Sequence, residues 1–201
     1  MNFLSIDCCT DRGSLFLKVK NKSFCRILQS DKFNNDLLMS QISDFFKENN
    51  LSFDDISQVF VNQGPGNFSI LRSSLAIAKG ICLAKNLKLF GYDTFLLLAA
   101  KFLKKYIYIC IILIYRNKYF IKNFSKDLLT YKNPKEIEID EILKKHKNSF
   151  KIILKNDENY FDKRILDLNN INIVNLDYTE LTKLKKNYFS EKSSIKPIYL
   201  S

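Results

Sequence analysis

The spacing of apolar residues divides the first half of the chain into strands and helices. Alternating apolar positions predict strands, and apolar repeats of three and four residues predict helices. The expected order is three strands, a helix, a strand, a helix, a strand and a helix. These elements are expected at residues 3–6, 15–19, 24–28, 34–48, 59–61, 68–85, 87–92 and 94–105. Asp93 and Thr94 are suited to cap the last helix, because their side-chain oxygens can accept hydrogen bonds from its first N–H groups.

The second half of the chain repeats this order. Its elements are expected at residues 107–114, 119–124, 127–131, 134 onward, 150–154, 160–168, 171–174 and 179–187. The helix after the third strand is expected to begin at Pro134, because proline is favoured in a first helical turn. A duplicated β-β-β-α-β-α-β-α unit is typical of two ribonuclease-H-like lobes, as in actin-like (ASKHA) proteins and sugar kinases. We therefore expect an α/β protein with one lobe at 1–105 and a second, reduced lobe at 106–201.

Composition indicates a globular chain. Of the 201 residues, 46% are hydrophobic, which can supply a core for one domain or two small lobes. The longest apolar run, 106–115, is shorter than the roughly 20 residues that cross a bilayer. The first residues show none of the features of a secretory leader, so we expect a cytoplasmic protein with no membrane contact. We expect small buried thiols, and neither disulfides nor zinc ligands, at Cys8, Cys9, Cys25, Cys82 and Cys110.

The net charge of +11 leaves two interpretations open. Lysine and arginine contacts to phosphates supply most non-specific affinity for nucleic acid, so the charge could mark an RNA-binding face. Lysine, asparagine, isoleucine and phenylalanine are abundant together, as an AT-rich genome would give, and the lysines are spread along the chain. The same charge is therefore also consistent with an ordinary solvated surface.

Two segments carry residue types that could serve a nucleotide site. Asp7 and Thr10 follow the first strand, where an acid could help to hold Mg²⁺ or could simply cap the turn. The Gly64-Pro65-Gly66 turn leads into the long helix, where backbone N–H groups could face an anion. A tight strand-to-helix turn is the simpler interpretation of the same residues. The second half of the chain contains no glycine, so it lacks a matching phosphate loop.

The helix after this turn has two different faces. Ala76, Gly80 and Ala84 recur at four-residue spacing, and small residues so spaced let another helix approach closely. Gly80 costs about 1 kcal/mol relative to alanine inside a helix, which indicates a packing reason for it. The opposite face is apolar, with Leu71 and Leu75, so one face can pack within the lobe and the other against a partner.

Two cationic side chains stand out by position. Arg72 lies in the second turn of that helix, where its charge opposes the helix dipole, so we expect it to pair with an acid or an anion. His146 is the only histidine and lies in a basic run near a helix end. A metal pair or catalytic triad would need further partners that the sequence does not offer. We therefore expect no catalytic residue and no independently bound cofactor or metal.

The run GPGNFSILRSSLAIAKG, from Gly64 to Gly80, resembles the signature of the TsaB (YeaZ) family. That signature reads GPGSFTGLR and continues into a small-residue helix ending in AKG. Residues 6–10 resemble the family's opening IDTST, and residues 196–200 resemble its closing P-x-YLR. The chain departs from the family pattern at Ile70, which replaces a glycine, and at Ser201, which replaces an arginine.

Proteins of this family are the non-catalytic partners of the TsaD ATPase in bacterial synthesis of N6-threonylcarbamoyladenosine at position 37 of tRNAs that read codons starting with A. The resemblance implies a heterodimer with a TsaD-type subunit through the first-lobe helices. It also implies a capacity for a homodimer over an overlapping surface and recruitment of a TsaE-type ATPase. ATP and metal are then expected on the partner subunits, with tRNA contacted through the complex.

The resemblance also selects candidate site residues. Those expected at the helix interface are Leu38, Ile42, Phe45, Leu71, Arg72, Leu75, Ala76, Ala78, Lys79 and Gly80. Those that match the family motif at the cleft are Asp7, Thr10, Gly64, Pro65, Gly66 and Phe68. From the residues alone, two alternatives stay open: a small-molecule kinase or ATPase that uses Asp7 and the Gly64 turn, and a basic RNA-binding module.

Overall fold

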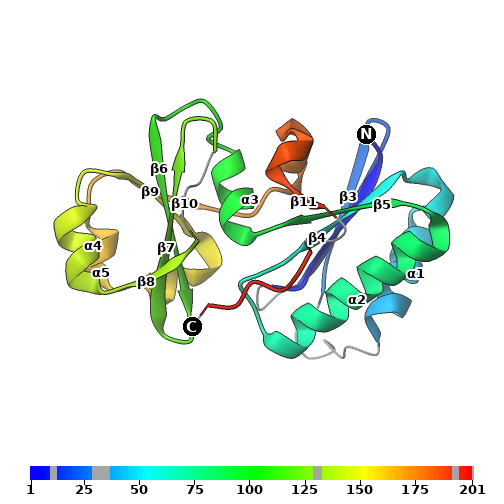
Figure 1. Cartoon of the computed structure of the whole chain (residues 1–201), viewed down its shortest axis with the longest axis horizontal. Coiled ribbons are helices and arrows are strands. Elements are labelled where there is room, and N and C mark those ends of the chain that lie inside the picture. The colour runs from blue at the N-terminus through cyan, green and yellow to red at the C-terminus, as the bar shows by residue number, and fades with distance from the viewer. Residues whose placement is uncertain (10–12, 29–36, 129–132, 192–194, 201) are drawn as a thin grey trace. The chain divides into compact units, whose positions relative to one another are not determined.

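The structure is a computed structural model that describes residues 1–9, 13–28, 37–128, 133–191 and 195–200 (Figure 1). Its contacts divide the chain into two units. One unit is Met1–Thr94 with Lys185–Tyr199, and the other is Phe95–Leu184 with Leu200–Ser201. This division differs from the sequence-based bounds of 1–105 and 106–201. Residues near the end of the chain belong with the first unit, where Ser190 and Glu191 pair with Gly91 and Phe90.

The first unit is built on a mixed sheet. The first strands form an antiparallel meander, and the later ones add in parallel to its other side. Within the described residues this sheet has six strands in the order β11-β5-β4-β1-β2-β3. The strands are β1 (Phe3–Asp7), β2 (Ser14–Val19), β3 (Lys22–Ile27), β4 (Gln58–Asn62), β5 (Lys88–Tyr92) and β11 (Ser190–Glu191).

Two helices, α1 (Leu38–Glu48) and α2 (Phe68–Lys85), pack on one face of this sheet and form its core with the inward strand residues (Figure 1). The bounds of α2 follow from its ends. The Asn67 side chain accepts hydrogen bonds from the N–H groups of Ser69 and Ile70, and Asn86 stops the helix in a left-handed conformation with φ 51°. The sequence-based bounds of 68–85 are therefore confirmed.

The opposite face of the first sheet carries a cluster of aromatic rings. Phe60 lies at its centre, with ring centroids 5.0 Å from Phe3, 5.4 Å from Phe90 and 4.8 Å from Phe189. Successive strand residues point to opposite faces, so Phe60 lies on one side while its neighbours Val59 and Val61 face the helices. The short 3-10 helix η6 (Lys186–Tyr188) positions Phe189 for this contact.

Cys25 departs from the expectation that all the cysteines are buried. Cys8, Cys82 and Cys110 are buried and Cys9 is partly buried, but Cys25 is exposed. The reason is its strand: β3 is the edge of the sheet, and its alternate residues point away from the core.

The second unit is a smaller version of the same design. Its described strands form a sheet in the order β10-β9-β6-β7-β8. The elements from α3 onward are α3 (Thr94–Ala100), β6 (Tyr108–Tyr115), β7 (Lys118–Ser125), β8 (Lys135–Ile137), α4 (Ile139–Lys145), β9 (Phe150–Leu154), η4 (Lys155–Tyr160), α5 (Lys163–Leu166), β10 (Ile171–Val174) and η5 (Tyr178–Lys183). The helices α4 and α5 contribute Ile142 and Ile165 to its core.

Two sequence-based expectations in this region are wrong, and a third falls mostly outside the described residues. Pro134 does not open a helix, because the residues after it form β8, whose pairing with β7 outweighs the local helical preference. The strand expected at 127–131 lies partly outside the described residues, and Asp127 within it is in a turn. The helix expected at 179–187 is instead two short 3-10 turns, η5 and η6.

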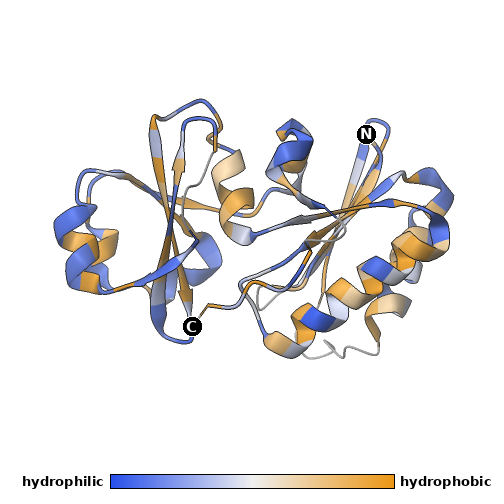
Figure 2. Ribbon diagram, viewed as in Figure 1, coloured by the Kyte–Doolittle hydropathy of each residue, from blue (hydrophilic) through white to orange (hydrophobic). Residues whose placement is uncertain are grey.

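Figure 2 shows that the central strands are mostly apolar and the connecting turns mostly polar. The apolar run 106–115 is not helical, since most of it is strand β6. Among the helices that the structure describes, none combines the length and the apolar character needed to cross a membrane.

Candidate functional site

The carboxyl ends of β1 and β4 bring Asp7 and Asn62 together. These strands are parallel neighbours, with Ile6 paired to Val61, so their last residues meet at one edge of the sheet. The Asp7 carboxylate accepts hydrogen bonds from the Asn62 Nδ2 group at 2.9 Å and from the Cys9 backbone N–H at 3.0 Å. Asp7 and Asn62 are both fully buried. The carboxylate is therefore held by the chain's own donors.

Asn62 extends this network to the glycine turn. Its Nδ2 group also donates to Thr94 Oγ1 at 2.9 Å, and its Oδ1 accepts from the Gly64 N–H at 3.0 Å. The Thr94 N–H in turn donates to the Gly64 carbonyl at 3.0 Å. One amide side chain thus links β1, β4, the turn and the start of α3. Sequence reasoning missed Asn62; its only signal was its position at a strand end directly before Gly-Pro-Gly.

The turn itself is packed tightly against the chain. Gly64 has φ +127°, and a Cβ there would lie 2.6 Å from the Ile198 carbonyl oxygen. A Cβ on Gly66 would lie 2.8 Å from the Cys9 Cα atom. Pro65 between them is buried as well. Glycine is therefore needed here for close approach of the chain's own backbone. Thr10, the other expected cleft residue, lies outside the described residues.

The thiols beside Asp7 are poor nucleophiles in this environment. Burial raises the pKa of Cys8, and the negative charge of Asp7 raises it further. The pKa of the Cys9 thiol is raised by the same two causes in the same order. Both thiols therefore stay protonated near neutral pH. In the described part of the chain, no group of three or more His, Cys, Asp or Glu side chains is placed to hold a metal ion.

The ten candidate interface residues fall into two groups. Six of them are at most 4% exposed and pack inside the first unit. These six are Leu38, Ile42, Phe45, Leu71, Leu75 and Ala78. They hold α1 and α2 on the sheet, so at most a small part of each side chain can touch another molecule. The other four, Arg72, Ala76, Lys79 and Gly80, are exposed on α2.

These four residues share one face of α2 with Phe68 and Leu83, and we call the six together the α2 outer face. Phe68 is 46% exposed and Leu83 is 76% exposed, so the face carries two accessible apolar side chains. Nothing lies within 4 Å of the position where a Cβ on Gly80 would stand. Sequence reasoning missed Leu83, although its spacing from Lys79 and Gly80 puts it on the same helix face.

Arg72 does not pair with an acid among the described residues. Its Nε group donates to the Tyr199 hydroxyl at 3.2 Å, and its guanidinium lies over the Phe68 ring, 3.9 Å from the centroid. Phe68 and Tyr199 are stacked on each other with centroids 5.1 Å apart. The expected partner was an acid or an anion; no acid fills that role among the described residues, and pairing with an anion stays a prediction.

His146 is the C-cap of α4 in the second unit, and its Nδ1 lies 3.9 Å from the Cys110 sulfur. Burial lowers the pKa of His146, and the positive charge of Lys135 lowers it further. Burial raises the pKa of Cys110 to about 12. A neutral imidazole beside a protonated buried thiol is a packing contact and does not form an activated dyad.

Comparison with known proteins gives matches over part of the sequence. The model of the TsaD family, described as tRNA N6-adenosine threonylcarbamoyltransferase, matches residues 30–112. The chain is 34% identical over 85 residues to the tRNA threonylcarbamoyladenosine biosynthesis protein TsaB of Buchnera aphidicola subsp. Baizongia pistaciae. That match covers 42% of this chain and 38% of that relative's length.

Comparison of structures extends over the whole chain. A Pseudomonas aeruginosa protein described as similar to peptidase YEAZ has a TM-score of 0.74 and 12% identity, covering 100% of this chain and 99% of that one. YeaZ from the same organism has a TM-score of 0.69 and 11% identity, covering 98% and 100%. A Bacteroides thetaiotaomicron protein with an actin-like ATPase fold has a TM-score of 0.53 and 11% identity, covering 92% and 96%. The resemblance to TsaB (YeaZ) proteins and the α/β fold of two ribonuclease-H-like lobes are confirmed.

Proposed function

We propose, with the similarity to TsaB proteins as the premise, that this chain is a non-catalytic subunit in tRNA threonylcarbamoyladenosine synthesis. It binds a TsaD-type catalytic subunit and supports that subunit while it attaches a threonylcarbamoyl group to N6 of adenosine 37, in tRNAs that read codons starting with A. ATP and metal are bound by the partner subunits, and tRNA is contacted through the assembled complex in the cytoplasm.

The observation that carries this proposal is the α2 outer face. Gly80 lies inside an exposed stretch of helix, where glycine costs about 1 kcal/mol relative to alanine. Because the space around it is open, packing inside the first unit does not offset that cost. A second helix can approach closest where no Cβ stands. Leu83 and Phe68 offer apolar surface on the same face, which a partner would bury.

The strand-end network supports the non-catalytic part of the proposal. An acid that organises Mg²⁺ must turn its oxygens toward the metal and its bound phosphates. In this chain the Asp7 carboxylate receives hydrogen bonds from Asn62 and Cys9 and is fully buried. At Gly64 and Gly66, backbone atoms of Ile198 and Cys9 occupy the space next to the turn. Equilibrium dialysis tests the rival kinase or ATPase function: tight ATP–Mg²⁺ binding by the lone chain, weakened in Asp7→Asn, would support that rival.

The proposal includes two further contacts. Without its TsaD-type partner, the α2 outer face buries its apolar side chains in a homodimer. A TsaE-type ATPase then joins the heterodimer once it has formed.

Reconstitution of the tRNA modification tests the proposed function. Purified TsaD-type and TsaE-type subunits, a threonylcarbamoyl donor, ATP–Mg²⁺ and tRNA are incubated with and without this chain, and modified nucleoside is measured by mass spectrometry. We expect product only when the chain is present, and none when Gly80→Leu replaces it. Equal product formation with and without the chain would contradict the proposal.

A further inference from the structure

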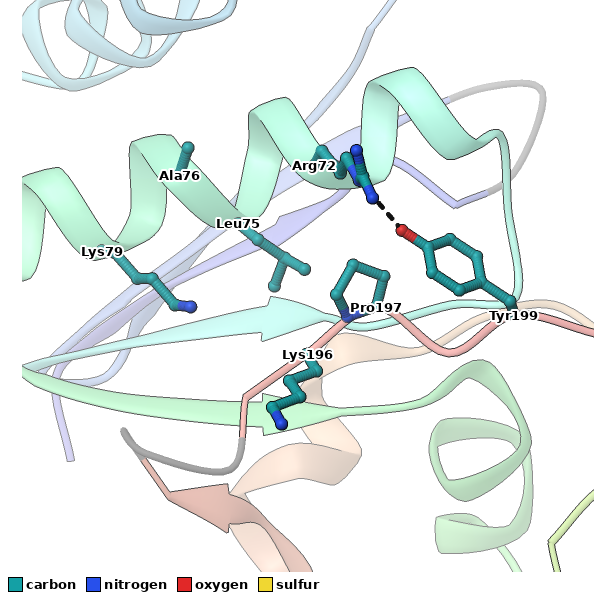
Figure 3. Close-up of a pocket in the computed structure, with 7 residues that line it drawn as sticks. All are labelled: Arg72, Leu75, Ala76, Lys79, Lys196, Pro197 and Tyr199. Carbon is teal, nitrogen blue, oxygen red and sulfur yellow. Dashed lines mark hydrogen bonds between the residues drawn. The ribbon is translucent and has the colours of Figure 1, made fainter.

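A groove runs along α2 beside the segment that ends the first unit. Its volume is about 400 Å³. It is lined by Arg72, Leu75, Ala76, Lys79, Lys196, Pro197 and Tyr199. Figure 3 shows Arg72 and Tyr199 at one end, Lys79 at the other, and Leu75 and Pro197 between them. The groove therefore has an apolar middle and cationic ends.

The cations of the groove face no acidic side chain in the described part of the chain. Among the described residues, no carboxylate lies within ion-pair distance of Arg72, Lys79 or Lys196. Lys79 Nζ donates to the Ile195 carbonyl at 3.2 Å, which leaves two of its N–H groups for another acceptor. Like charges gathered in one groove repel one another and attract a ligand of opposite charge.

Arg72 is held in position before any ligand arrives. The Tyr199 hydroxyl bonds its Nε at 3.2 Å, and the Phe68 ring lies against the guanidinium, 3.9 Å from the centroid. Both contacts leave the Nη1 and Nη2 groups without a partner among the described residues. A guanidinium fixed in this way loses little freedom when it binds a carboxylate through two parallel hydrogen bonds.

The shape of the groove favours a protein segment over the backbone of a nucleic acid. Arg72 and Lys79 are two helical turns apart, about 10 Å along the axis of α2. In an extended peptide, residues four apart lie on the same face about 13 Å from each other, with a third residue on that face between them. Long flexible arginine and lysine side chains can cover the difference. Leu75 and Pro197 would contact an apolar central residue, which a chain of phosphates does not provide.

We propose that this groove binds an extended acidic segment of a protein partner, with one carboxylate at Arg72, another at Lys79, and an apolar side chain between them over Leu75 and Pro197. The inference deepens the proposed function by naming the chemistry of the partner segment that binds here. It rests on the proposed function only for the identity of that partner.

An NMR titration of the lone, full-length, ¹⁵N-labelled chain tests this inference. The probe is the peptide acetyl-Glu-Ser-Leu-Ser-Glu-amide, whose two carboxylates flank a leucine on one face. We expect amide shifts at Ala76, Lys79 and Lys196. The dissociation constant should rise by about fivefold or more in Arg72→Ala, because the bidentate contact is lost. It should rise at least as much in Ala76→Glu, which places a negative charge in the groove without disturbing the core.

Controls separate the acidic segment from other ligands. Lys47→Ala removes one exposed positive charge from α1, outside the groove, and should leave the peptide affinity unchanged. The inference is overturned if the peptide with glutamine in both glutamate positions binds equally well, or if no groove amide shifts. It is also overturned if oligouridylate or inorganic phosphate binds the groove more tightly than the peptide does. Because no TsaD-type subunit is present, any of these results leaves the proposed assembly to be judged separately.

Discussion

Asn62 joins three parts of the first unit through one amide side chain. It donates to the Asp7 carboxylate and to Thr94, and it accepts from the Gly64 N–H. Replacing it by alanine would leave a buried carboxylate short of one donor and a buried N–H without its acceptor. We expect Asn62→Ala to lower the free energy of unfolding by about 3 kcal/mol. Urea unfolding followed by circular dichroism measures this.

The control for that variant is Asn187→Ala, at an exposed position in η6. It should change the free energy of unfolding by less than about 0.5 kcal/mol. Equal, small effects at Asn62 and Asn187 would show that the strand-end network contributes little to folding.

His146 makes the stability of the second unit depend on pH. Burial, followed by the charge of Lys135, lowers its pKa in the folded state. Between that lowered pKa and the unfolded value of about 6.5, the unfolded chain binds more protons than the folded one. Stability therefore falls as the pH drops through about 6.5, and this loss levels off below the folded pKa. We expect His146→Gln to lose less stability than the natural chain between pH 7.5 and pH 5.5, measured by urea midpoints.

A parallel pH profile for the natural chain and His146→Gln would contradict this account of His146. Asp140→Asn, at an exposed position on the same helix, serves as a control for changes in helix charge.

At the scale of elements, Gly80 gives the clearest prediction. A Cβ at this position meets nothing within 4 Å, and the residue is inside α2. Gly80→Ala should therefore raise the free energy of unfolding by about 1 kcal/mol, because alanine costs less backbone entropy in a helix. The same substitution at Gly66 should destabilise strongly, since its Cβ would lie 2.8 Å from the Cys9 Cα atom. Urea unfolding of both variants gives the comparison, and destabilisation by Gly80→Ala would show unrecognised packing there.

Local signals were enough for some elements and not for others. The bounds of α2 could be predicted because Asn67 and Asn86 define its ends within the helix's own sequence. The residues after Pro134 are predicted from sequence to form a helix, but they form β8 because they pair with β7. The same limit applies to the site. Asn62 matters because β1 and β4 are neighbours, and it bonds Asp7 across 55 positions of sequence.

The sequence indicated two faces of α2 but not which of the candidate residues on them a partner can reach. Both faces contain small and apolar residues, so Leu75 and Ala76 were equally good candidates for an interface. Only the sheet beneath the helix decides between them: Leu75 is 4% exposed, while Ala76 faces outward. The sequence identified the right helix, and the fold selected the residues on it that a partner can contact.

At the scale of the whole molecule, the chain has an actin-like fold, and its accessible features support the proposal that it binds a protein. The Asp7 carboxylate is buried and accepts hydrogen bonds from the chain itself, and the glycine turn packs against other backbone atoms of the chain. The α2 outer face, in contrast, is accessible over its length and has apolar side chains at Phe68 and Leu83. These observations agree with a chain that acts by holding another subunit.

Sedimentation velocity of the chain mixed with a TsaD-type subunit at micromolar concentration tests that central claim most directly. The natural chain should co-sediment with the partner, and Gly80→Leu should not, although its circular dichroism spectrum should match that of the natural chain. Lys144→Leu, an equally large apolar substitution on α4, should co-sediment normally. Separate boundaries for the natural chain and the TsaD-type subunit, or unchanged binding by Gly80→Leu, would contradict the account.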